Sequence, residues 1–491
     1  MTPLKQFTIG KLVLIALIVG VACGTTQAVT TSDPSPTSTS SPTSGSTSAP
    51  SLTSTPAPTP VSSVKLPDDA RSLFEAWRII MEDFVEIEDL DPRVLSDGAI
   101  FGLLEVLGDT TISISQARDF SFELKNVDGY FNVDGGDELR EVYEVWAYAY
   151  TNKPDSDIES FDLNEAAIDG MIAALADPYT AFLSPDDIRL EQEDLQGSFD
   201  GIGAFVSIND EGYVVVVAPM ENTPAEAAGI LAGDTILEVN GEATNSMSLR
   251  ESILRIRGPR GTDVELLVKH LLDDVTVLIT ITRGDIPVPS VRVNMVTDEI
   301  ARIRIDQFTR RTPGETEQAI LEARDLGAKA LILDVRQNPG GLLVETVQVA
   351  SHFLSGGLVL FEEDGDGRRT DWPAQRGGVD LEIPLVVLVD QFSASGAEVL
   401  AGALQDRNRA TLIGTQTFGK GSVTHLRGLS DGSGLYITFA RWFTPLGQLI
   451  EGEGITPDIE VLFTEADDAA QRDPQLEAAI EHLEAIIGSD T

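Results

Sequence analysis

Two residues, Ser395 and Lys420, have the side chains and the surroundings that nucleophilic catalysis needs. Ser395 lies in DQFSASGAEVLAGAL (390–404), after the apolar run LVVLV (385–389), which predicts a buried strand, and before an expected helix over 397–405. A strand-to-helix turn presents a serine sharply, and the helix N-terminus favours the negative charge that develops on attack. Lys420 follows in a Gly-flanked turn, and a buried, neutral lysine can take the serine proton.

The chain between these two residues can bring them together. Lys420 comes 420 − 395 = 25 residues after Ser395, and the pattern between them predicts one helix, one strand and two turns. A third segment, DVRQNPGG (334–341), runs from an apolar strand into a Gly-rich turn. Such a turn exposes backbone N–H groups, which suit an anion or an oxyanion.

Two other interpretations of these segments have to be weighed. Gly414 to Lys420 matches the first part of a phosphate-binding P-loop, but Gly421 stands where the Ser or Thr for magnesium is needed, and no helix is expected to follow. His425 could complete a Ser–His–Asp triad, although its position indicates an ordinary strand residue. The sequence therefore favours a lysine base over a nucleotide site or a histidine base.

Composition narrows the function classes. With 34 Lys+Arg and 79 Asp+Glu the net charge is 34 − 79 = −45, which argues against nucleic acid as the main partner. One cysteine excludes an internal disulfide framework, and the four scattered histidines show no ligand spacing, so no metal and no cofactor is expected. The stretch DGDG (364–367) lacks the other ligands of a calcium loop and predicts a hairpin tip.

The N-terminal residues predict export. Residues 12–22 are an apolar run too short for a comfortable membrane span, and Cys23 follows directly, a pattern that resembles a bacterial lipoprotein signal, with Gly20 in place of the usual Leu. A cleaved signal ending near Ala28 is the alternative. Residues 25–63 are almost entirely Thr, Ser, Pro, Ala and Gly, so we expect an extended stalk without a core.

Three folded regions follow. Helical periodicity dominates residues 66–190, where 98–109 and 166–177 share five of twelve residues as a weak repeat; this region is expected to be a scaffold without chemistry. Short strands with Gly at their turns mark residues 198–285. Strands and helices alternate beyond Pro287, which predicts a layered α/β core.

The middle region resembles a PDZ domain of the bacterial type, through GIGA (201–204) and AGILAGDTILEVNG (228–241). PDZ domains capture an extended C-terminal peptide by strand addition, with loop amides on its carboxylate. The resemblance implies a peptide site, whose expected residues are Gly201, Ile202, Gly203 and Ala204 in the loop and first strand, and Leu249 and Ile253 in the second helix.

Residues 66–465 resemble the carboxyl-terminal processing, or tail-specific, proteases of the S41 serine peptidase family. The similarity rests on GMIAALADPYTAFLSP (170–185), LDVRQNPGGLL (333–343), the serine segment, FGKG (418–421) and GEGITPDIEV (452–461). It implies a catalytic dyad of Ser395 and Lys420, with oxyanion donors at Gly340, Gly341 and Gly396.

Two residues depart from the family pattern. The serine segment usually reads SASASE but here reads SASGAE, so that Gly396 is expected to loosen the nucleophile turn. Four residues after the lysine the family often has a Gln that orients the amine; here it is Thr424, whose shorter side chain accepts only locally. Thr424 is therefore a candidate third member of the catalytic group.

The sequence thus predicts a multidomain α/β protein: an exported bacterial envelope protein that is lipid-anchored at the outer face of the cytoplasmic membrane. Its expected function is that of a serine endopeptidase acting on protein tails with free C-termini; a non-catalytic PDZ adaptor is the alternative, and a homo-oligomer stays open. The expected parts are a signal peptide (1–23), a disordered linker (24–65), a helical N-terminal domain (66–195), a PDZ domain (198–285), an S41-type catalytic α/β core (286–465) and a C-terminal helix (466–491).

Overall fold

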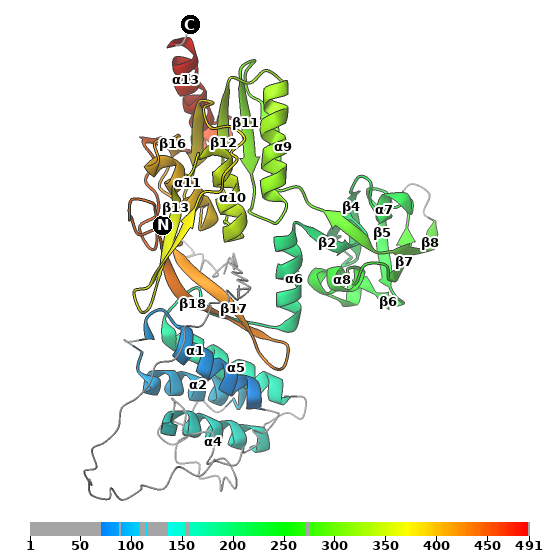
Figure 1. Cartoon of the computed structure of the whole chain (residues 1–491). Coiled ribbons are helices and arrows are strands. Elements are labelled where there is room, and N and C mark those ends of the chain that lie inside the picture. The colour runs from blue at the N-terminus through cyan, green and yellow to red at the C-terminus, as the bar shows by residue number, and fades with distance from the viewer. Residues whose placement is uncertain are drawn as a thin grey trace, which may run out of the picture. The chain divides into compact units, whose positions relative to one another are not determined.

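The computed structural model describes residues 70–87, 90–108, 114, 136–152, 158–209, 211–271 and 275–489 (Figure 1). The expected signal peptide, Cys23 and the Ser/Thr/Pro-rich linker lie outside these residues. The described residues divide into two compact units: those of 70–81 and 91–174 form one, and those of 82–90 and 175–489 form the other. Within the described residues, no helix is both long and apolar enough to cross a membrane.

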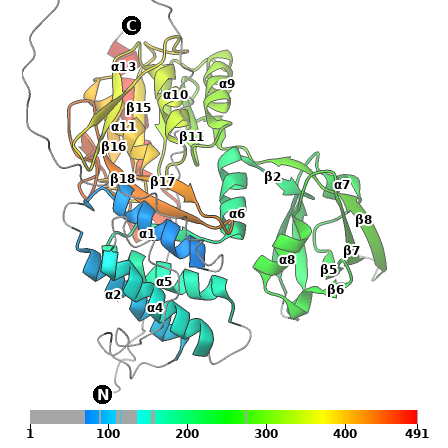
Figure 2. The same cartoon turned by 60° about the horizontal axis from the view of Figure 1, so that its bottom comes forward.

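The first unit is built from helices (Figure 2). They are α1 (Arg71–Asp83), α2 (Pro92–Val106), α4 (Gly136–Asn152) and α5 (Ser160–Leu175). Helices α2 and α5 carry the two copies of the weak repeat and touch at glycines: a Cβ on Gly98 would lie 2.2 Å from the Gly170 carbonyl oxygen, and one on Gly102 would lie 2.0 Å from that of Ala166. The repeated glycine therefore allows two backbones to approach closely.

Residues 198–287 form a small β-domain. Its main sheet has the order β3 (Ala204–Ile208), β4 (Val214–Pro219), β5 (Thr235–Val239), β7 (Asp263–Lys269), β8 (Thr276–Thr282), with β6 (Glu242–Ala243) on β5. Helices α7 (Pro224–Ala227) and α8 (Leu249–Ile256) accompany it, and β2 (Ser198–Gly201) pairs with β9 (Gly284–Pro287). Strand β3 pairs only with β4 among the described strands, so its other edge is open to an added strand.

The third region is centred on a six-stranded sheet. Its order is β10 (Val291–Met295), β11 (Ile300–Ile305), β12 (Ala330–Asp334), β15 (Leu385–Val389), β16 (Thr411–Gly414), β19 (Ile459–Glu460), and all pairs except β10–β11 are parallel. Helices α9 (Thr312–Asp325), α10 (Leu343–Phe353) and α11 (Gly396–Asp406) cover one face, and α13 (Pro474–Ser489) packs on the other (Figure 1). The central strands β12 and β15 are buried on both faces, as their apolar runs predict.

A second sheet belongs to the same compact unit. It contains β1 (Ala181–Leu183), β18 (Gly434–Phe443), β13 (Leu358–Asp364) and β14 (Arg369–Pro373), and β17 (Ser422–Gly428) also pairs with β18. Helix α6 (Pro185–Gln196) follows β1 and leads into β2. The DGDG stretch forms the connection between β13 and β14, as expected of a hairpin tip.

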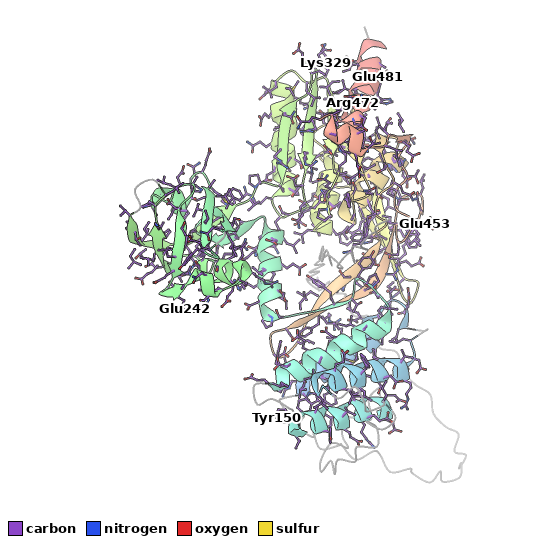
Figure 3. All side chains as sticks on the ribbon, turned by 180° about the vertical axis from the view of Figure 1, so that it is seen from behind. Tyr150, Glu242, Lys329, Glu453, Arg472 and Glu481 are labelled. Carbon is purple, nitrogen blue, oxygen red and sulfur yellow. The ribbon has the colours of Figure 1, made fainter. Side chains whose placement is uncertain are left out.

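The predicted α/β multidomain fold, with a helical N-terminal region, a PDZ-type domain and a layered core, is confirmed. Residues 466–491, predicted as one helix, hold a short α12 (Glu465–Ala469) and then α13, because Pro474 starts a new helix. Exposed charged residues such as Lys329, Arg472 and Glu481 line the outside of the core region (Figure 3).

Candidate active site

The three segments singled out in the sequence meet where parallel strands end. Strands β12 and β15 are neighbours and run parallel, so the residues that follow them emerge at the same edge of the sheet. There the Ser393 hydroxyl donates to the Val335 carbonyl oxygen (2.9 Å), and the Ala394 N–H donates to the Asn338 carbonyl oxygen (2.9 Å). The serine turn is thus joined to the Gly-rich turn by hydrogen bonds.

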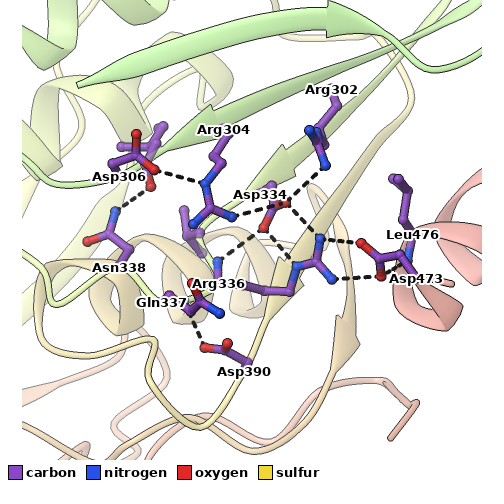
Figure 4. A network of polar contacts seen from close by, with 12 residues as sticks. Arg302, Arg304, Asp306, Asp334, Arg336, Gln337, Asn338, Asp390, Asp473 and Leu476 are labelled. Atoms are coloured by element: carbon purple, nitrogen blue, oxygen red, sulfur yellow. Dashed lines mark hydrogen bonds and ion pairs between the residues drawn. The ribbon is translucent and has the colours of Figure 1, made fainter. Parts of the chain in front are cut away.

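Charged side chains hold the Gly-rich segment to the rest of the core (Figure 4). Asp334, which is fully buried, accepts from the Arg336 guanidinium (2.9 and 2.8 Å), and Arg336 also donates to Asp473 at the start of α13 (2.8 and 2.9 Å). On the other side, the Gln337 N–H donates to the Asp390 carboxylate (2.9 Å). These bonds fix the path of the chain from β12 into the turn.

Ser395 has the backbone geometry of a sharply presented nucleophile. It is the N-cap of α11, with φ 54° and ψ −113°, a region that non-glycine residues rarely occupy. It is only 1% exposed. A Cβ on Gly340 would lie 2.8 Å from both the Ser395 Cβ and the Gly396 nitrogen, so only glycine allows this turn to pack against the serine.

The predicted oxyanion residues surround Ser395, but not all of their amides are available. The Gly340 N–H donates to the Asn338 side-chain oxygen (2.7 Å), so this amide already has a partner, and its role as an oxyanion donor stays a prediction. Gly341 pairs with Phe308 in a parallel β-bridge, whose hydrogen bonds are made by the Gly340 carbonyl oxygen and the Leu342 N–H. The Gly341 N–H itself therefore points away from Phe308. Gly396 is the first residue of α11, where an N–H has no intrahelical partner. Gly341 and Gly396 remain the candidate donors.

Glu398 connects the serine to the lysine. Its buried carboxylate accepts from the Ser395 N–H (2.8 Å) and the Lys420 N–H (2.8 Å), and also from the Thr417 hydroxyl (2.5 Å) and the Gly419 N–H (2.6 Å). Burial raises the pKa of Glu398, and these hydrogen bonds oppose the rise. One side chain thus places both segments of the predicted dyad.

Lys420 lies in a closed turn. It is 7% exposed, and residues 450–454 pack against the turn so closely that a Cβ on Gly421 would lie 2.3 Å from the Glu451 nitrogen. The outer side of this packing segment carries the exposed Glu453 (Figure 3). Lys420 is thereby held in surroundings from which water is largely excluded.

This burial suits a base. Desolvation lowers the pKa of the Lys420 ammonium to about 8, although the carboxylates of Glu451, Glu191, Asp177 and Glu398 oppose the shift. A substantial fraction of the amine is therefore neutral at mildly alkaline pH, as general-base catalysis requires.

The end of the helical region contributes to the lysine site. The Lys420 Nζ lies 4.9 Å from the centroid of the Tyr179 ring, a cation–π distance. Asp177 accepts from the Thr180 hydroxyl (2.6 Å) and the Thr438 hydroxyl (2.5 Å), which ties this segment to β18. Residues 177–180, which were expected to belong to a scaffold, therefore lie beside the predicted base.

The remaining candidates near the lysine lie on β17. Thr424 is 5% exposed, next to a bulge in the pairing with β18, and its orienting role stays a prediction. His425 is a strand residue, as favoured from the sequence, and its ring stacks on Phe439 with 3.6 Å between centroids. A strand, not a helix, follows Lys420, in line with the rejection of a P-loop.

The structure explains the glycine that departs from the family pattern. A Cβ on Gly396 would lie 2.6 Å from the Thr346 hydroxyl oxygen and 3.1 Å from the Phe308 ring. Thr346 is fully buried on α10 and donates to the Leu342 carbonyl oxygen (2.9 Å), so it occupies this space firmly. Gly396 is therefore packed tightly against its neighbours, contrary to the expectation that it loosens the turn.

The predicted peptide site lies in the small β-domain. Ile202 is 3% exposed and belongs to the domain core, and Ala204 and Leu249 pack against the same cluster; Ile253 is half-buried on α8. Gly201 ends β2, and Gly203 has φ 80°. Strand β3 begins at Ala204, so Ile202 and Gly203 lie in the connection between β2 and β3.

Sequence reasoning missed three residues of the lysine site: Glu398, Tyr179 and Glu191. For Glu398 a signal existed, since Ser395-x-x-Glu398 is a capping-box pattern, and the structure shows its Glu-to-N–H bond. The other two lie more than 200 residues from the lysine in sequence and show no local signal. Among the described residues, no group of three or more His, Cys, Asp or Glu could hold a metal ion.

Comparison with known proteins places both regions in families. Residues 299–461 match the model of peptidase family S41, and residues 190–269 match that of the PDZ domain. These matches confirm the resemblance to peptidase family S41 and to PDZ domains that the sequence shows.

Several curated proteins are similar to this chain. The chain is 37% identical over 328 residues to a probable CtpA-like serine protease of Staphylococcus aureus (strain COL), covering 66% of this chain and 64% of that protein. It is 36% identical over 332 residues to one of Staphylococcus haemolyticus (strain JCSC1435), covering 66% of each. The chain thus spans slightly less than two thirds of these relatives' length. A solved photosystem II D1 C-terminal processing protease is 28% identical, with TM-score 0.45, covering 81% of this chain and 94% of that one.

Replacing Glu398 with Gln should reduce activity by about 100-fold or more. The Gln side chain keeps the shape but offers one acceptor oxygen to four donors, and each buried donor left unpaired costs about 1–3 kcal/mol. Glu453→Gln, an exposed change in the adjacent segment, is the control and should be silent. Peptide-cleavage rates and urea unfolding of both variants test this, and equal rates would remove Glu398 from the positioning of the dyad.

Gly396→Ala should destabilise the protein by about 1–3 kcal/mol and slow cleavage, because the added methyl overpacks against Thr346. Adding Thr346→Ala should recover much of both losses. Gly314→Ala is the matched control, because a Cβ there meets nothing within 4 Å. Unfolding midpoints of the single and double variants measure the coupling; simple additivity would contradict the packing argument.

Proposed function

We propose that the chain is a serine endopeptidase that binds the C-terminal tails of exported proteins through its PDZ domain and cleaves them with Ser395 and Lys420. The observation that carries this proposal is the Glu398 carboxylate, which accepts from the backbone N–H groups of both residues. The strained backbone at Ser395 and the buried surroundings of Lys420 add to it.

The reaction is acyl transfer. Neutral Lys420 accepts the proton of the Ser395 hydroxyl as its oxygen attacks the peptide carbonyl carbon, and the oxyanion is stabilised by the N–H groups of Gly341 and Gly396. The proton then passes to the leaving amine, and an ester to the substrate's acyl part remains. Water hydrolyses this ester with Lys420 again as base, and Thr424 helps to aim its amine.

Tail recognition rests on the open edge of β3 and on the loop before it. A peptide added to β3 would form backbone hydrogen bonds along the strand, with its carboxylate at the loop amides near Gly203. Ala204, Leu249 and Ile253 lie where they can contact apolar final side chains, while the buried Ile202 supports them from the core. Cys23 would be the lipid attachment point that keeps the enzyme at the outer face of the cytoplasmic membrane.

Ser395→Ala should lower the cleavage of an unfolded protein substrate by about 10⁴-fold or more while the fold is kept. Lys420→Arg should do nearly the same, because Arg cannot act as a neutral base. The wild-type rate should rise with pH through about 8, since the neutral lysine is the active form. His425→Ala is the control and should keep most of the activity. If His425→Ala lost activity while Lys420→Arg kept it, a Ser–His–Asp triad would be indicated instead.

Free and amidated C-termini distinguish the enzyme from an adaptor. Peptides with a free carboxylate should bind Ser395→Ala and be cut faster by the wild type than their amidated forms. Tails that bind but are never cut would favour a non-catalytic PDZ adaptor. Equal cleavage of free and amidated tails would remove the PDZ domain from substrate selection.

A further inference from the structure

The face of the six-stranded sheet on which α13 packs changes from apolar to basic along β11. Ile300 belongs to the apolar cluster under α13, and the next two side chains on that side of the strand are those of Arg302 and Arg304. The parallel register places Arg304 beside Asp334 on β12. Two arginines therefore lie toward the carboxyl end of a parallel strand, where α/β proteins commonly bind ligands.

A cavity of about 410 Å³ lies at this place. Its lining combines the guanidinium groups of Arg302, Arg304 and Arg336 with three apolar side chains that are largely exposed. These apolar side chains are Phe392, Leu462 and Phe463. The volume is in the range that is usual for small-molecule sites, and the lining suits a ligand that joins an anion to an apolar group.

Arg302 is poorly paired for a guanidinium that is mostly buried. Its side chain is 27% exposed, and its Nη1 atom lies 3.9 Å from an Asp334 oxygen, which is beyond hydrogen-bonding distance (Figure 4). Its Nε–H is buried and has no hydrogen-bond partner in the described part of the chain. Buried donors in native proteins normally have a partner, so this arginine is a candidate to bind a group from outside the chain.

Asp334 does not satisfy Arg302 and Arg304, because Arg336 occupies it. The two Asp334 oxygens accept from the Arg336 side chain (2.9 and 2.8 Å) and from the Arg336 N–H (3.2 Å). The Arg304 Nη1 atom is 3.6 Å from Asp334, and only the Arg304 Nε–H makes a close contact, with Asp306 (2.8 Å). Because a guanidinium has five N–H donors, both arginines keep donors for a ligand.

Two carboxylates also line the cavity, and both already accept hydrogen bonds. Asp473 accepts from the Arg336 side chain (2.8 and 2.9 Å). Asp390 accepts from the Gln337 N–H (2.9 Å) and the Phe392 N–H (3.0 Å). These donors share the negative charge of the two carboxylates, which weakens their repulsion of an anion in the cavity.

The cavity is separate from the proposed catalytic residues. Arg302 and Arg304 lie on the α13 face of the sheet, whereas α11, which begins directly after Ser395, packs on the other face. The two places are connected through the chain, because Phe392 at the cavity precedes Ser395 by only three residues. A ligand in the cavity would therefore contact the segment that leads to the nucleophile without occupying its site.

We propose that this cavity binds a carboxylate joined to an apolar group, the chemistry of a peptide's C-terminal residue with an apolar side chain. Arg302 and Arg304 bind the carboxylate, because a guanidinium fork matches its two oxygens. The three exposed apolar side chains of the lining contact the apolar group. The proposal goes beyond the proposed function, since binding here needs no catalysis and no PDZ domain.

Binding of N-trifluoroacetyl-phenylalanine to the full chain with Ser395→Ala tests the proposal. A single residue is too short to add a strand to β3, so the PDZ domain should contribute little to this signal. The fluorine resonance should broaden and shift at millimolar ligand. The corresponding amide, which lacks the carboxylate, should bind about tenfold more weakly, because charged hydrogen bonds are lost. Equal binding of acid and amide would overturn the proposal.

Arg302→Gln in the same chain should weaken binding of the acid by about tenfold and leave the weak binding of the amide unchanged. Arg368→Gln is the matched control: Arg368 is 74% exposed between β13 and β14, and its loss removes the same charge from a different sheet. The control should bind as the parent does. Unchanged affinity in Arg302→Gln, or an equal loss in Arg368→Gln, would contradict a site at the cavity.

Two further measurements keep the test decisive. If Arg302→Gln does not fold, Arg302→Lys keeps the charge but loses the planar fork, and it should still bind the acid several-fold more weakly; full affinity would contradict the proposal. Inorganic phosphate separates a general anion site from a carboxylate site, because it lacks the apolar group. Phosphate that displaced the acid at equal or lower concentration would overturn the assignment of an apolar carboxylate. None of these results depends on peptidase activity.

Discussion

The site depends on one buried carboxylate. Glu398 is fully buried, and its four hydrogen bonds join the first turn of α11 to the lysine turn, which the chain reaches only after the rest of α11 and strand β16. The same bond to the Ser395 N–H caps α11 and holds the serine at positive φ. Helix capping and catalytic positioning are therefore one interaction, and the desolvation of this charge is offset by the donors it orders.

Much of the architecture could be predicted because it is local. The alternation of apolar strands and helices beyond Pro287 predicts the parallel sheet, and the run LVVLV followed by a serine and a helix predicts where Ser395 lies. The glycines at 340 and 341 predict a turn after β12, and in the structure Gly340 packs against Ser395 with no room for a Cβ. Such signals depend on a few neighbouring residues, so the sequence displays them.

The remaining parts of the site could not be predicted from the sequence, because they depend on contacts between segments that are far apart in the chain. Nothing near Gly340 shows that its N–H is taken by Asn338, and nothing near Tyr179 shows that its ring lies beside the Lys420 amine. The tight packing of Gly396 needs Thr346, fifty residues earlier, and the sequence alone suggested the opposite, a loose turn. Each of these features depends on which side chain, from a distant part of the sequence, lies beside the residue in the folded protein.

A base lysine in so acidic a chain poses an electrostatic problem. The net charge is −45, and each carboxylate near Lys420 stabilises its protonated form. The structure limits this effect by directing most of those carboxylates to backbone N–H and hydroxyl donors, which share their negative charge. Burial can then lower the pKa of the lysine despite its neighbours.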